Sequence, residues 1–204
     1  MRIITQIVKA GKGRYRIFTE DREAFLLYRA DIAKYDLEVG KEIEDDFEDR
    51  LCLEVLNERA KNRLLYLLQA KDYTSKEMEE KLRTALYPER SIDYAIGQMK
   101  YYGYIDDERY AHRYCEYFLE RKSICEIRRT LLKKGVNREV VSTTIEEIKE
   151  EKGYSEENES QMIRSLLEKR HYDPDTADEK EKRRQIAFLM RRGFSYSEIR
   201  RGLG

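Results

Sequence analysis

The sequence predicts a mainly α-helical protein, made of tandem three-helix repeats in an elongated, curved arrangement, with a small N-terminal β-rich segment. Only two prolines and ten glycines occur among 204 residues, so long stretches are free to form helix. After about residue 45, apolar side chains recur mostly at three- to five-residue steps, the spacing of one helix face. A helix-start motif also occurs three times, which indicates internal repetition.

The composition excludes several classes of protein. Charged residues make up 40% of the chain, yet Lys+Arg and Asp+Glu both number 41, so the formal net charge is zero. This balance argues against a uniformly basic nucleic-acid coat and against a disordered polyelectrolyte, which combines low hydrophobicity with high net charge. Because no apolar run approaches about 18 residues, we expect no membrane partner and a cytoplasmic location.

Residues 1–50 are expected to form a β-hairpin-containing segment and an acidic connection. Residues 3–8 are rich in β-branched side chains, and residues 15–19 form the second strand beyond a Gly11-Lys12-Gly13 turn. Residues 24–28 add a third strand or begin a short helix that continues to Tyr35. The Gly-x-Gly pattern lies within the hairpin, which favours a turn over a phosphate-binding loop.

Three modules follow, with expected boundaries at 51–104, 105–153 and 154–204. The acidic run that leads into the first contains eight acids and two bases between residues 36 and 50, and Asp45 and Asp46 suit a helix N-terminus. Each module is expected to bury apolar stripes. These stripes are Leu51, Val55, Ala60, Leu64, Leu65 and Leu68; Met78, Leu82 and Leu86; Ile92, Ala95, Ile96 and Met99; Tyr110, Tyr114, Cys115 and Phe118; Ile127 and Leu131; Val140, Val141, Thr144, Ile145 and Ile148; Met162, Ile163, Leu166 and Leu167; Ile186, Leu189 and Met190; and Ile199 and Leu203.

The repeated motif reads [ST]-x-x-E-[MI]-x-x-x-L and begins at Thr74, Ser123 and Ser195. The hydroxyl can accept a hydrogen bond from the third backbone N–H of a helix while the glutamate reaches back, so each copy predicts a helix start. The segments 131–137 and 189–195 share a second pattern of a basic last turn, a glycine and a new cap. Modules of about fifty residues bury little surface alone, and therefore we expect them to pack in series.

Basic residues gather in the last two modules. Residues 121–134 contain six bases and one acid, and residues 180–201 contain eight bases and two acids. One interpretation is a solvated surface with bases at helix C-termini; the other is a stripe that binds phosphates or an acidic protein groove. The candidate contact residues are Arg128, Arg129, Lys133, Lys134, Arg183, Arg184, Arg191 and Arg192. We refer to these eight as the basic set.

The acidic triplet Asp106-Asp107-Glu108 also has two interpretations. Adjacent acids hold Mg²⁺ in some nucleases, but neighbouring positions on a helix do not face one point. A helix N-cap at Asp106, with two acids in the first turn, explains the triplet and is favoured. Three cysteines without C-x-x-C spacing are interpreted as small hydrophobic residues, and two distant histidines, His112 and His171, as helix-surface residues. We therefore predict no catalytic residues, no metal and no cofactor.

The same motifs, in this order, resemble the RecX family of regulatory proteins. The resemblance rests on residues 73–78 with Leu82, residues 104–111, residues 131–136 and residues 191–195, and it covers about residues 55–204. Ser123 stands where the family often has glycine, and the segment 86–88 lacks the glycine that ends the equivalent helix of the second repeat. The N-terminal β-like segment resembles the longer members of the family.

This resemblance implies a function that composition does not show. RecX proteins bind the helical groove of the RecA–DNA filament and restrain ATP hydrolysis, strand exchange and coprotease activity, in DNA repair, recombination and the SOS response. We accordingly expect a monomeric, non-enzymatic regulator that meets single- or double-stranded DNA through the filament, or weakly alone. Two other functions remain open: an independent DNA-binding protein of three-helix modules, and a divalent-metal nuclease built on the acidic triplet.

Overall fold

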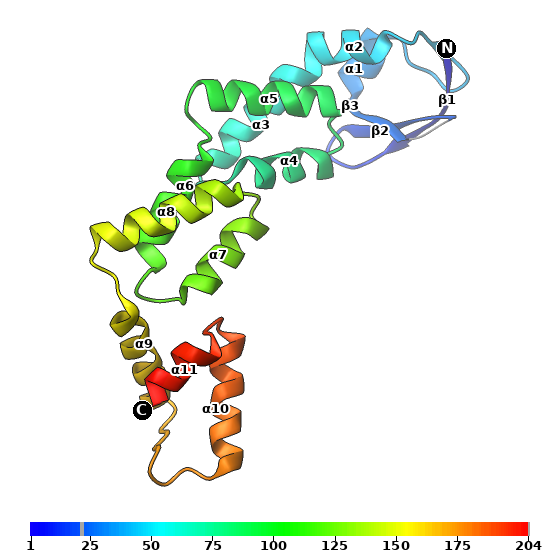
Figure 1. The fold of residues 1–204 in the computed structure, drawn as a ribbon. Helices are drawn as coiled ribbons and strands as arrows, with labels where there is room; N and C mark the ends of the chain where they lie inside the picture. Colours follow the sequence, from blue (N-terminus) through cyan, green and yellow to red (C-terminus); the bar gives the residue numbers. More distant parts are fainter. Residues whose placement is uncertain (21–22, 204) are drawn as a thin grey trace. The chain divides into compact units, whose positions relative to one another are not determined.

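The structure is a computed structural model that describes residues 1–20 and 23–203 (Figure 1). It divides into two compact units, Met1–Ile105 and Asp106–Gly204, and each is described by itself. The first unit contains a small sheet and a group of helices, and the described residues of the second form helices joined by loops. The predicted class, a mainly α protein of three-helix repeats with an N-terminal β segment, is confirmed.

The sheet of the first unit is antiparallel, with strand order β3-β2-β1-β4. Its strands are β1 (Arg2–Lys9), β2 (Arg14–Thr19), β3 (Glu23–Tyr28) and β4 (Glu42–Ile43). Gly11, Lys12 and Gly13 all have positive φ, so the predicted hairpin turn is confirmed. Residues 24–28 were expected to form a third strand or to begin a short helix. The structure contains both in succession, because strand β3 leads directly into helix α1 (Arg29–Lys34).

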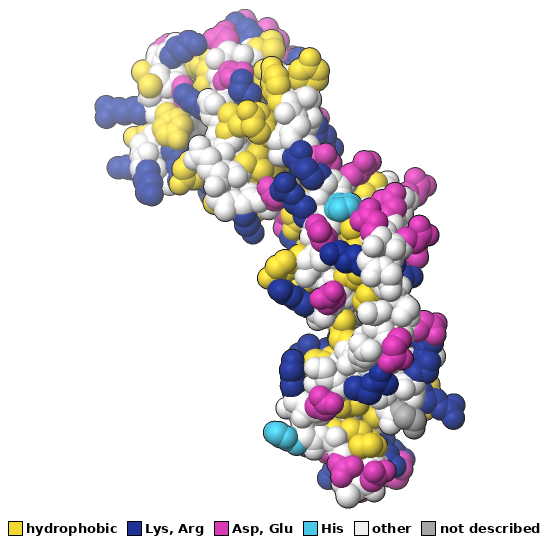
Figure 2. Space-filling view, turned by 90° about the vertical axis from the view of Figure 1, so that its left-hand side faces the viewer, with side chains coloured by type: hydrophobic (Ala, Val, Ile, Leu, Met, Phe, Trp, Pro, Cys, Tyr) yellow, Lys and Arg dark blue, Asp and Glu magenta, His cyan; other side chains and the backbone are white. Residues whose placement is uncertain are grey.

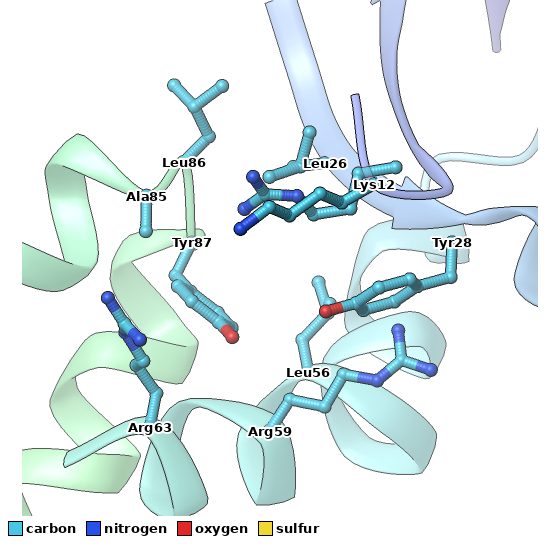
Figure 3. Close-up of a pocket in the computed structure, with 10 residues that line it drawn as sticks. Lys12, Leu26, Tyr28, Leu56, Arg59, Arg63, Ala85, Leu86 and Tyr87 are labelled. Atoms are coloured by element: carbon cyan, nitrogen blue, oxygen red, sulfur yellow. The ribbon is translucent and has the colours of Figure 1, made fainter. Parts of the chain in front are cut away.

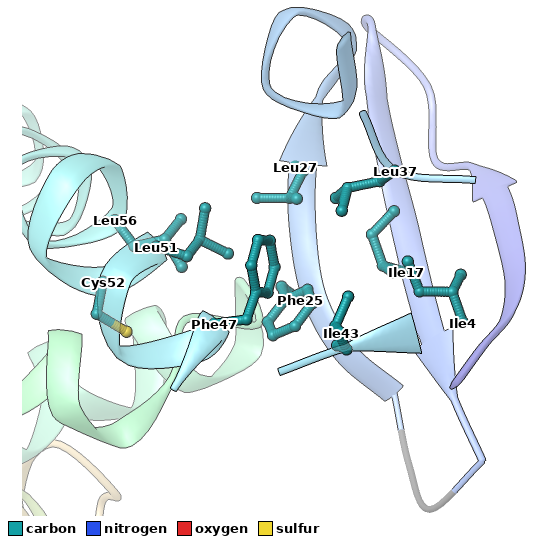
Figure 4. Close-up of a cluster of buried hydrophobic side chains, with 10 residues drawn as sticks. All are labelled: Ile4, Ile17, Phe25, Leu27, Leu37, Ile43, Phe47, Leu51, Cys52 and Leu56. Carbon is teal, nitrogen blue, oxygen red and sulfur yellow. The ribbon is translucent and has the colours of Figure 1, made fainter. Parts of the chain in front are cut away.

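A hydrophobic core joins this sheet to the first helical run. The run comprises α2 (Phe47–Leu51), a π-helical turn η1 (Cys52–Leu56) and α3 (Asn57–Leu68). Figure 4 shows Phe47 and Leu51 directed toward the sheet, where Ile17 and Phe25 are fully buried. The rings of Phe25 and Phe47 meet edge to face with centroids 6.0 Å apart. The sheet is therefore packed against the start of the helical chain.

Helix α3 packs with α4 (Ser75–Thr84) and α5 (Glu89–Tyr101) around a second core. The stripe on α5 is buried as predicted, with all four of its side chains at most 6% exposed. Leu86 is a correction, because it lies beyond the end of α4, half-buried, with φ of 61°. It occupies the left-handed position that follows a helix, where glycine is usual.

The second unit contains two groups of three helices. The first group is α6 (Asp107–Phe118), α7 (Ile124–Lys133) and α8 (Arg138–Glu151), and the second is α9 (Glu156–Glu168), α10 (Glu179–Arg191) and α11 (Tyr196–Leu203). The cores of these groups contain Ile127, Leu131 and Ile145, and Ile163, Leu189 and Ile199, respectively.

Three predictions in the second unit are corrected. On α6 the fully buried face is Ala111, Cys115 and Leu119, whereas the rings of Tyr110, Tyr114 and Phe118 lie half-buried beside it. Met190 is exposed, because its position on α10 turns away from the core around Leu189. His171 lies just past α9 in a left-handed conformation rather than on a helix surface.

The three predicted helix starts are confirmed. Thr74 Oγ1 accepts from Glu77 N at 3.3 Å and Thr74 N donates to Glu77 Oε2 at 3.1 Å, which is the reciprocal cap. Ser195 and Glu198 make the same pair of bonds. At Ser123 the hydroxyl accepts from Glu126 N and also donates to a carbonyl of the following helical group.

The cysteines differ from one another in exposure. Cys52 and Cys115 are buried, whereas Cys125 is exposed on α7 and is not a core residue. Burial raises the pKa of the Cys115 thiol to about 11, so it stays protonated at neutral pH. Among the helices of residues 1–20 and 23–203, none has both the length and the apolarity that a membrane crossing requires.

Candidate functional site

Helix α7 presents one pair from the basic set to solvent. Arg129 and Lys133 are exposed and lie one turn apart, while Ile127 and Leu131 face the core. The capped N-terminus at Ser123 fixes where the helix begins, and the buried side chains fix its rotation about its axis. The local sequence therefore directs these two positive charges outward.

Arg128 and Lys134 have partners within the second unit. Arg128 is half-buried, and its Nη1 donates to Ser142 Oγ on α8 at 2.8 Å. Lys134 is half-buried too, with its Nζ 5.4 Å from the centroid of the Tyr110 ring on α6. These two side chains fasten α7 to its neighbours, so they carry less charge outward than Arg129 and Lys133 do.

Helix α10 and the residue that follows it, Arg192, carry the other four residues of the basic set. Arg183 and Arg184 are exposed near its beginning, and Arg184 lies 3.8 Å from Glu181. Arg191 and Arg192 are exposed at its end, with the Arg192 guanidinium 5.1 Å from the centroid of the Phe188 ring. At the helical rise of about 1.5 Å per residue, Arg183 and Arg191 are about 12 Å apart along the helix.

A junction between the two helical groups brings the end of α10 to the start of α7. Ser123 Oγ donates to the carbonyl oxygen of Arg192 at 2.8 Å. Gly193 lies so close that an added Cβ would stand 2.8 Å from Ser123 Oγ. The structure therefore places Arg191 and Arg192 beside the helix that carries Arg129 and Lys133, whereas Arg183 and Arg184 lie two turns back along α10.

A buried carboxylate completes this junction. Glu159 on α9 is 8% exposed, and its Oε1 accepts from Ile124 N at 3.4 Å, at the start of α7. Burial raises the pKa of Glu159, and the nearby charge of Glu198 raises it further. The hydrogen bond from Ile124 opposes that shift without cancelling it.

This raised pKa predicts a pH-dependent junction. An acid whose pKa is higher in the folded state binds more protons there, so stability falls as the pH rises from 4.5 through the folded pKa. We expect Glu159→Gln to stabilise the second unit at neutral pH and to flatten its profile between pH 4.5 and 7, because glutamine still accepts from Ile124. Urea denaturation across this range measures both effects, and a variant less stable than the parent at pH 7 would contradict the prediction.

The sequence assigned Tyr110, Tyr114 and Phe118 to a buried stripe, and it did not identify the half-buried aromatic ladder that they form on α6. The Tyr110 and Tyr114 rings stack with centroids 6.4 Å apart, and the Phe118 ring continues the series at 4.5 Å. Lys122 Nζ lies 4.2 Å from the Phe118 centroid and Arg121 lies 4.1 Å from that of Tyr117. The four-residue spacing of the rings, followed directly by two cations, is the signal that indicates such a surface.

The acidic triplet forms a helix cap. Asp106 Oδ1 accepts from Arg109 N at 2.9 Å, so the favoured N-cap interpretation is confirmed, and Asp107 and Glu108 occupy the first turn of α6. Within residues 1–20 and 23–203, no three His, Cys, Asp or Glu side chains are grouped so as to hold a metal ion. The triplet therefore contributes to helix stability through the cap and the helix dipole.

Positive and negative side chains share the surface. On the face shown in Figure 2, dark-blue Lys and Arg side chains are interspersed with magenta Asp and Glu side chains over the helical part of the chain. Such a surface favours a contact in which particular charges match a partner over one held by a broad field of a single sign.

The fold and these surfaces define a class of protein: one built of tandem three-helix domains, whose exposed charged side chains are suited to binding a charged partner. Two family models match the chain, "RecX, third three-helix domain" over residues 156–203 and "RecX, first three-helix domain" over residues 60–99. A "Regulatory protein RecX" of Caldanaerobacter subterraneus subsp. tengcongensis is 30% identical, and the alignment covers 98% of each chain. A protein of the same name from Clostridium acetobutylicum is 27% identical, and the alignment covers 94% of this chain and 89% of that one. The chain belongs to the RecX family of regulatory proteins.

Solved structures share the fold. A crystal structure of a regulatory protein RecX aligns with a TM-score of 0.60 at 21% identity, covering 97% of both chains. That of RecX from Lactobacillus salivarius aligns with a TM-score of 0.58 at 23% identity, covering 72% of this chain and 94% of that one. These similarities show that the fold is shared.

Proposed function

We propose that this protein binds the groove of the RecA–DNA filament and inhibits the recombinase, lowering ATP hydrolysis, strand exchange and coprotease activity. Membership of the RecX family carries the proposal. The three repeats, with boundaries at 51–104, 105–153 and 154–204, act as successive contact modules along the filament. Contacts to several protomers give avidity without one very strong site.

The junction between α7 and α10 supports a role for the basic set. Ser123 and Gly193 hold the start of α7 against the end of α10, and Glu159 holds it against α9. The exposed charges on α7 and at the end of α10 therefore keep a fixed spacing. A fixed spacing reduces the conformational entropy lost on binding. Within the basic set, Arg129, Lys133, Arg191 and Arg192 are the contact residues that the geometry supports best.

Reversal of two of these four charges tests the proposal. We expect Arg191→Glu with Arg192→Glu to raise the concentration needed for half-inhibition of filament ATP hydrolysis about tenfold, which corresponds to roughly 1.4 kcal/mol of binding. The thermal midpoint should change little, because both side chains are exposed. ATP turnover on preassembled filaments, together with imaging of filament length, measures the effect.

Arg138→Glu with Lys169→Glu is the matched control. It makes the same change in charge at exposed positions of the same unit outside the basic set. Equal loss of inhibition in the two variants would show that only net charge matters, and the basic set would then not be the contact surface. Absence of inhibition by the parent protein at every ratio would contradict the proposed function itself.

Contact with DNA phosphates is proposed to be electrostatic and weak outside the filament. A protein that makes about six phosphate contacts loses roughly a thousandfold in affinity between 50 and 200 mM salt. Binding of the chain alone to duplex DNA is therefore expected to fall steeply with salt. Sequence-selective binding that survives physiological salt would favour an independent DNA-binding protein instead.

A further inference from the structure

A cavity of about 400 Å³ opens in the first unit, between the sheet and the helices. It is formed by three parts of the chain that are far apart in the sequence: the turn after β1 with strands β2 and β3, the end of η1 with the first half of α3, and the segment that follows α4 (Figure 3). All of its lining residues belong to this one unit. Its volume is within the range of about 300–1,000 Å³ typical of small-ligand sites.

The cavity is positively charged. Lys12, Arg14, Arg59 and Arg63 line it, and no acidic side chain is among its described lining residues. Asp31 compensates Arg59 from outside the cavity, because Arg59 Nη2 donates to Asp31 Oδ1 at 2.8 Å. Lys12, Arg14 and Arg63 therefore give the cavity a net positive charge. Two guanidinium groups and an ammonium suit a phosphate, since arginine matches its oxygens with paired donors.

Two tyrosine rings form the other part of the lining. Figure 3 shows Tyr28 and Tyr87 on either side of the open space, with both hydroxyls directed into it. The Arg59 guanidinium lies 4.9 Å from the centroid of the Tyr28 ring, which holds that ring in place. Tyr87 is half-buried, and burial raises the pKa of its phenol, so it remains a hydrogen-bond donor at neutral pH.

Two of the lining residues have a left-handed backbone conformation. Lys12 has φ of 48° between two glycines of the hairpin, and Leu86 has φ of 61° at the end of α4. Left-handed residues other than glycine are costly, so they persist only where the surroundings impose them. Both residues line the cavity, which indicates a preformed site.

We propose that this cavity binds a nucleoside phosphate, with the phosphates against Lys12, Arg14 and Arg63 and the base against the tyrosine rings. Aromatic rings can stack with a base while neighbouring cations bind its phosphates, so the two kinds of side chain together suit a nucleotide. The ligand has two sources, a free nucleotide or one nucleotide of a single strand. This site lies outside the basic set and does not depend on filament inhibition.

Calorimetric titration of the full chain, without recombinase, tests the proposal. The probes are ATP, adenosine, tripolyphosphate and a short oligothymidylate, all at low salt. We expect ATP or the oligonucleotide to bind at least about tenfold more tightly than adenosine, which lacks the charge, or tripolyphosphate, which lacks the ring. ATP binding supports the free nucleotide as the source, and binding of the oligonucleotide alone supports the strand.

Exposed positions supply the variants. Lys12→Gln with Arg63→Gln removes two charges from the cavity, and Lys76→Gln with Lys100→Gln removes two from exposed positions elsewhere in the same unit. The first pair should weaken binding at least about tenfold while the control pair leaves it unchanged, and Tyr28→Leu should remove the preference for ATP over tripolyphosphate. Equal affinities for the two charge variants would overturn the assignment. So would tripolyphosphate that binds as tightly as the nucleotide probe that binds best, or no binding of any probe at millimolar concentration.

Discussion

Replacing Gly193 with alanine is expected to destabilise the second unit by about 2–5 kcal/mol, because two penalties coincide. Gly193 has φ of 87°, a conformation that costs an L-residue roughly 1–2 kcal/mol. The new methyl carbon would also stand 2.8 Å from Ser123 Oγ and 3.2 Å from Glu126 N, which belongs to the backbone of α7. Forcing atoms into a packed contact typically costs about 1–3 kcal/mol.

Gly153→Ala is the matched control for this substitution. Gly153 also follows a helix and has φ of 60°, but nothing lies within 4 Å of the position an added Cβ would take. It should therefore show the backbone penalty of about 1–2 kcal/mol without the steric one. Urea denaturation of both variants measures the difference, and equal losses would show that the close approach at the junction does not form in solution.

The helix starts were predictable because their signals are local. A hydroxyl three residues before a glutamate satisfies N–H groups within a single turn, so the motifs at Thr74, Ser123 and Ser195 determine where three helices begin regardless of what surrounds them. The same reasoning predicted the cap at Asp106 and the left-handed glycines that follow the helices. Apolar spacing likewise predicted the buried stripe of α5.

Features that depend on tertiary contacts were not predictable. Leu86 continues the apolar spacing of α4, yet the chain turns there in a left-handed conformation, so the leucine lines a cavity instead of the core. The cavity itself is formed by side chains as distant in sequence as Lys12 and Tyr87. Periodicity also placed Tyr110 and Tyr114 on the buried face of α6, because it does not distinguish the centre of an apolar face from its edge.

Charge clustering identified the basic set, but its members differ in what they contact. Arg128 and Arg129 are adjacent in sequence, yet one donates to Ser142 while the other is exposed, since successive helical residues point about 100° apart. The sequence therefore indicates which segments are basic, and packing decides which charges a partner meets. For that reason Arg129, Lys133, Arg191 and Arg192 are the better targets for mutagenesis.

Asp31→Asn is expected to destabilise the first unit by about 3 kcal/mol. The Asp31 side chain is 6% exposed and holds Arg59 with two hydrogen bonds, while its Oδ2 also accepts from Tyr28 N at 2.9 Å. Removing one partner of a buried ion pair costs about 3–5 kcal/mol because it leaves the other charge uncompensated. The lower end of that range applies, since the Arg59 side chain is 33% exposed and water replaces part of the lost interaction.

The pH profile distinguishes this pair from an ordinary packing contact. Burial alone would raise the pKa of Asp31, but hydrogen bonds from Arg59 and from Tyr28 N, together with the charge of Arg59, lower it below 3.8. A carboxyl group whose pKa is lower in the folded state than in the unfolded state stabilises the protein at any pH above the unfolded-state pKa. That contribution is lost as the pH falls through the folded-state pKa. The difference between parent and Asp31→Asn should therefore be largest at neutral pH and shrink below pH 3.8. Glu54→Gln removes the exposed ion pair with Lys34 and keeps an amide oxygen that can accept from the Tyr35 hydroxyl, so it should have a small effect at any pH. A difference between parent and Asp31→Asn that stays constant down to pH 2 would show that the carboxylate acts through packing and not through its charge.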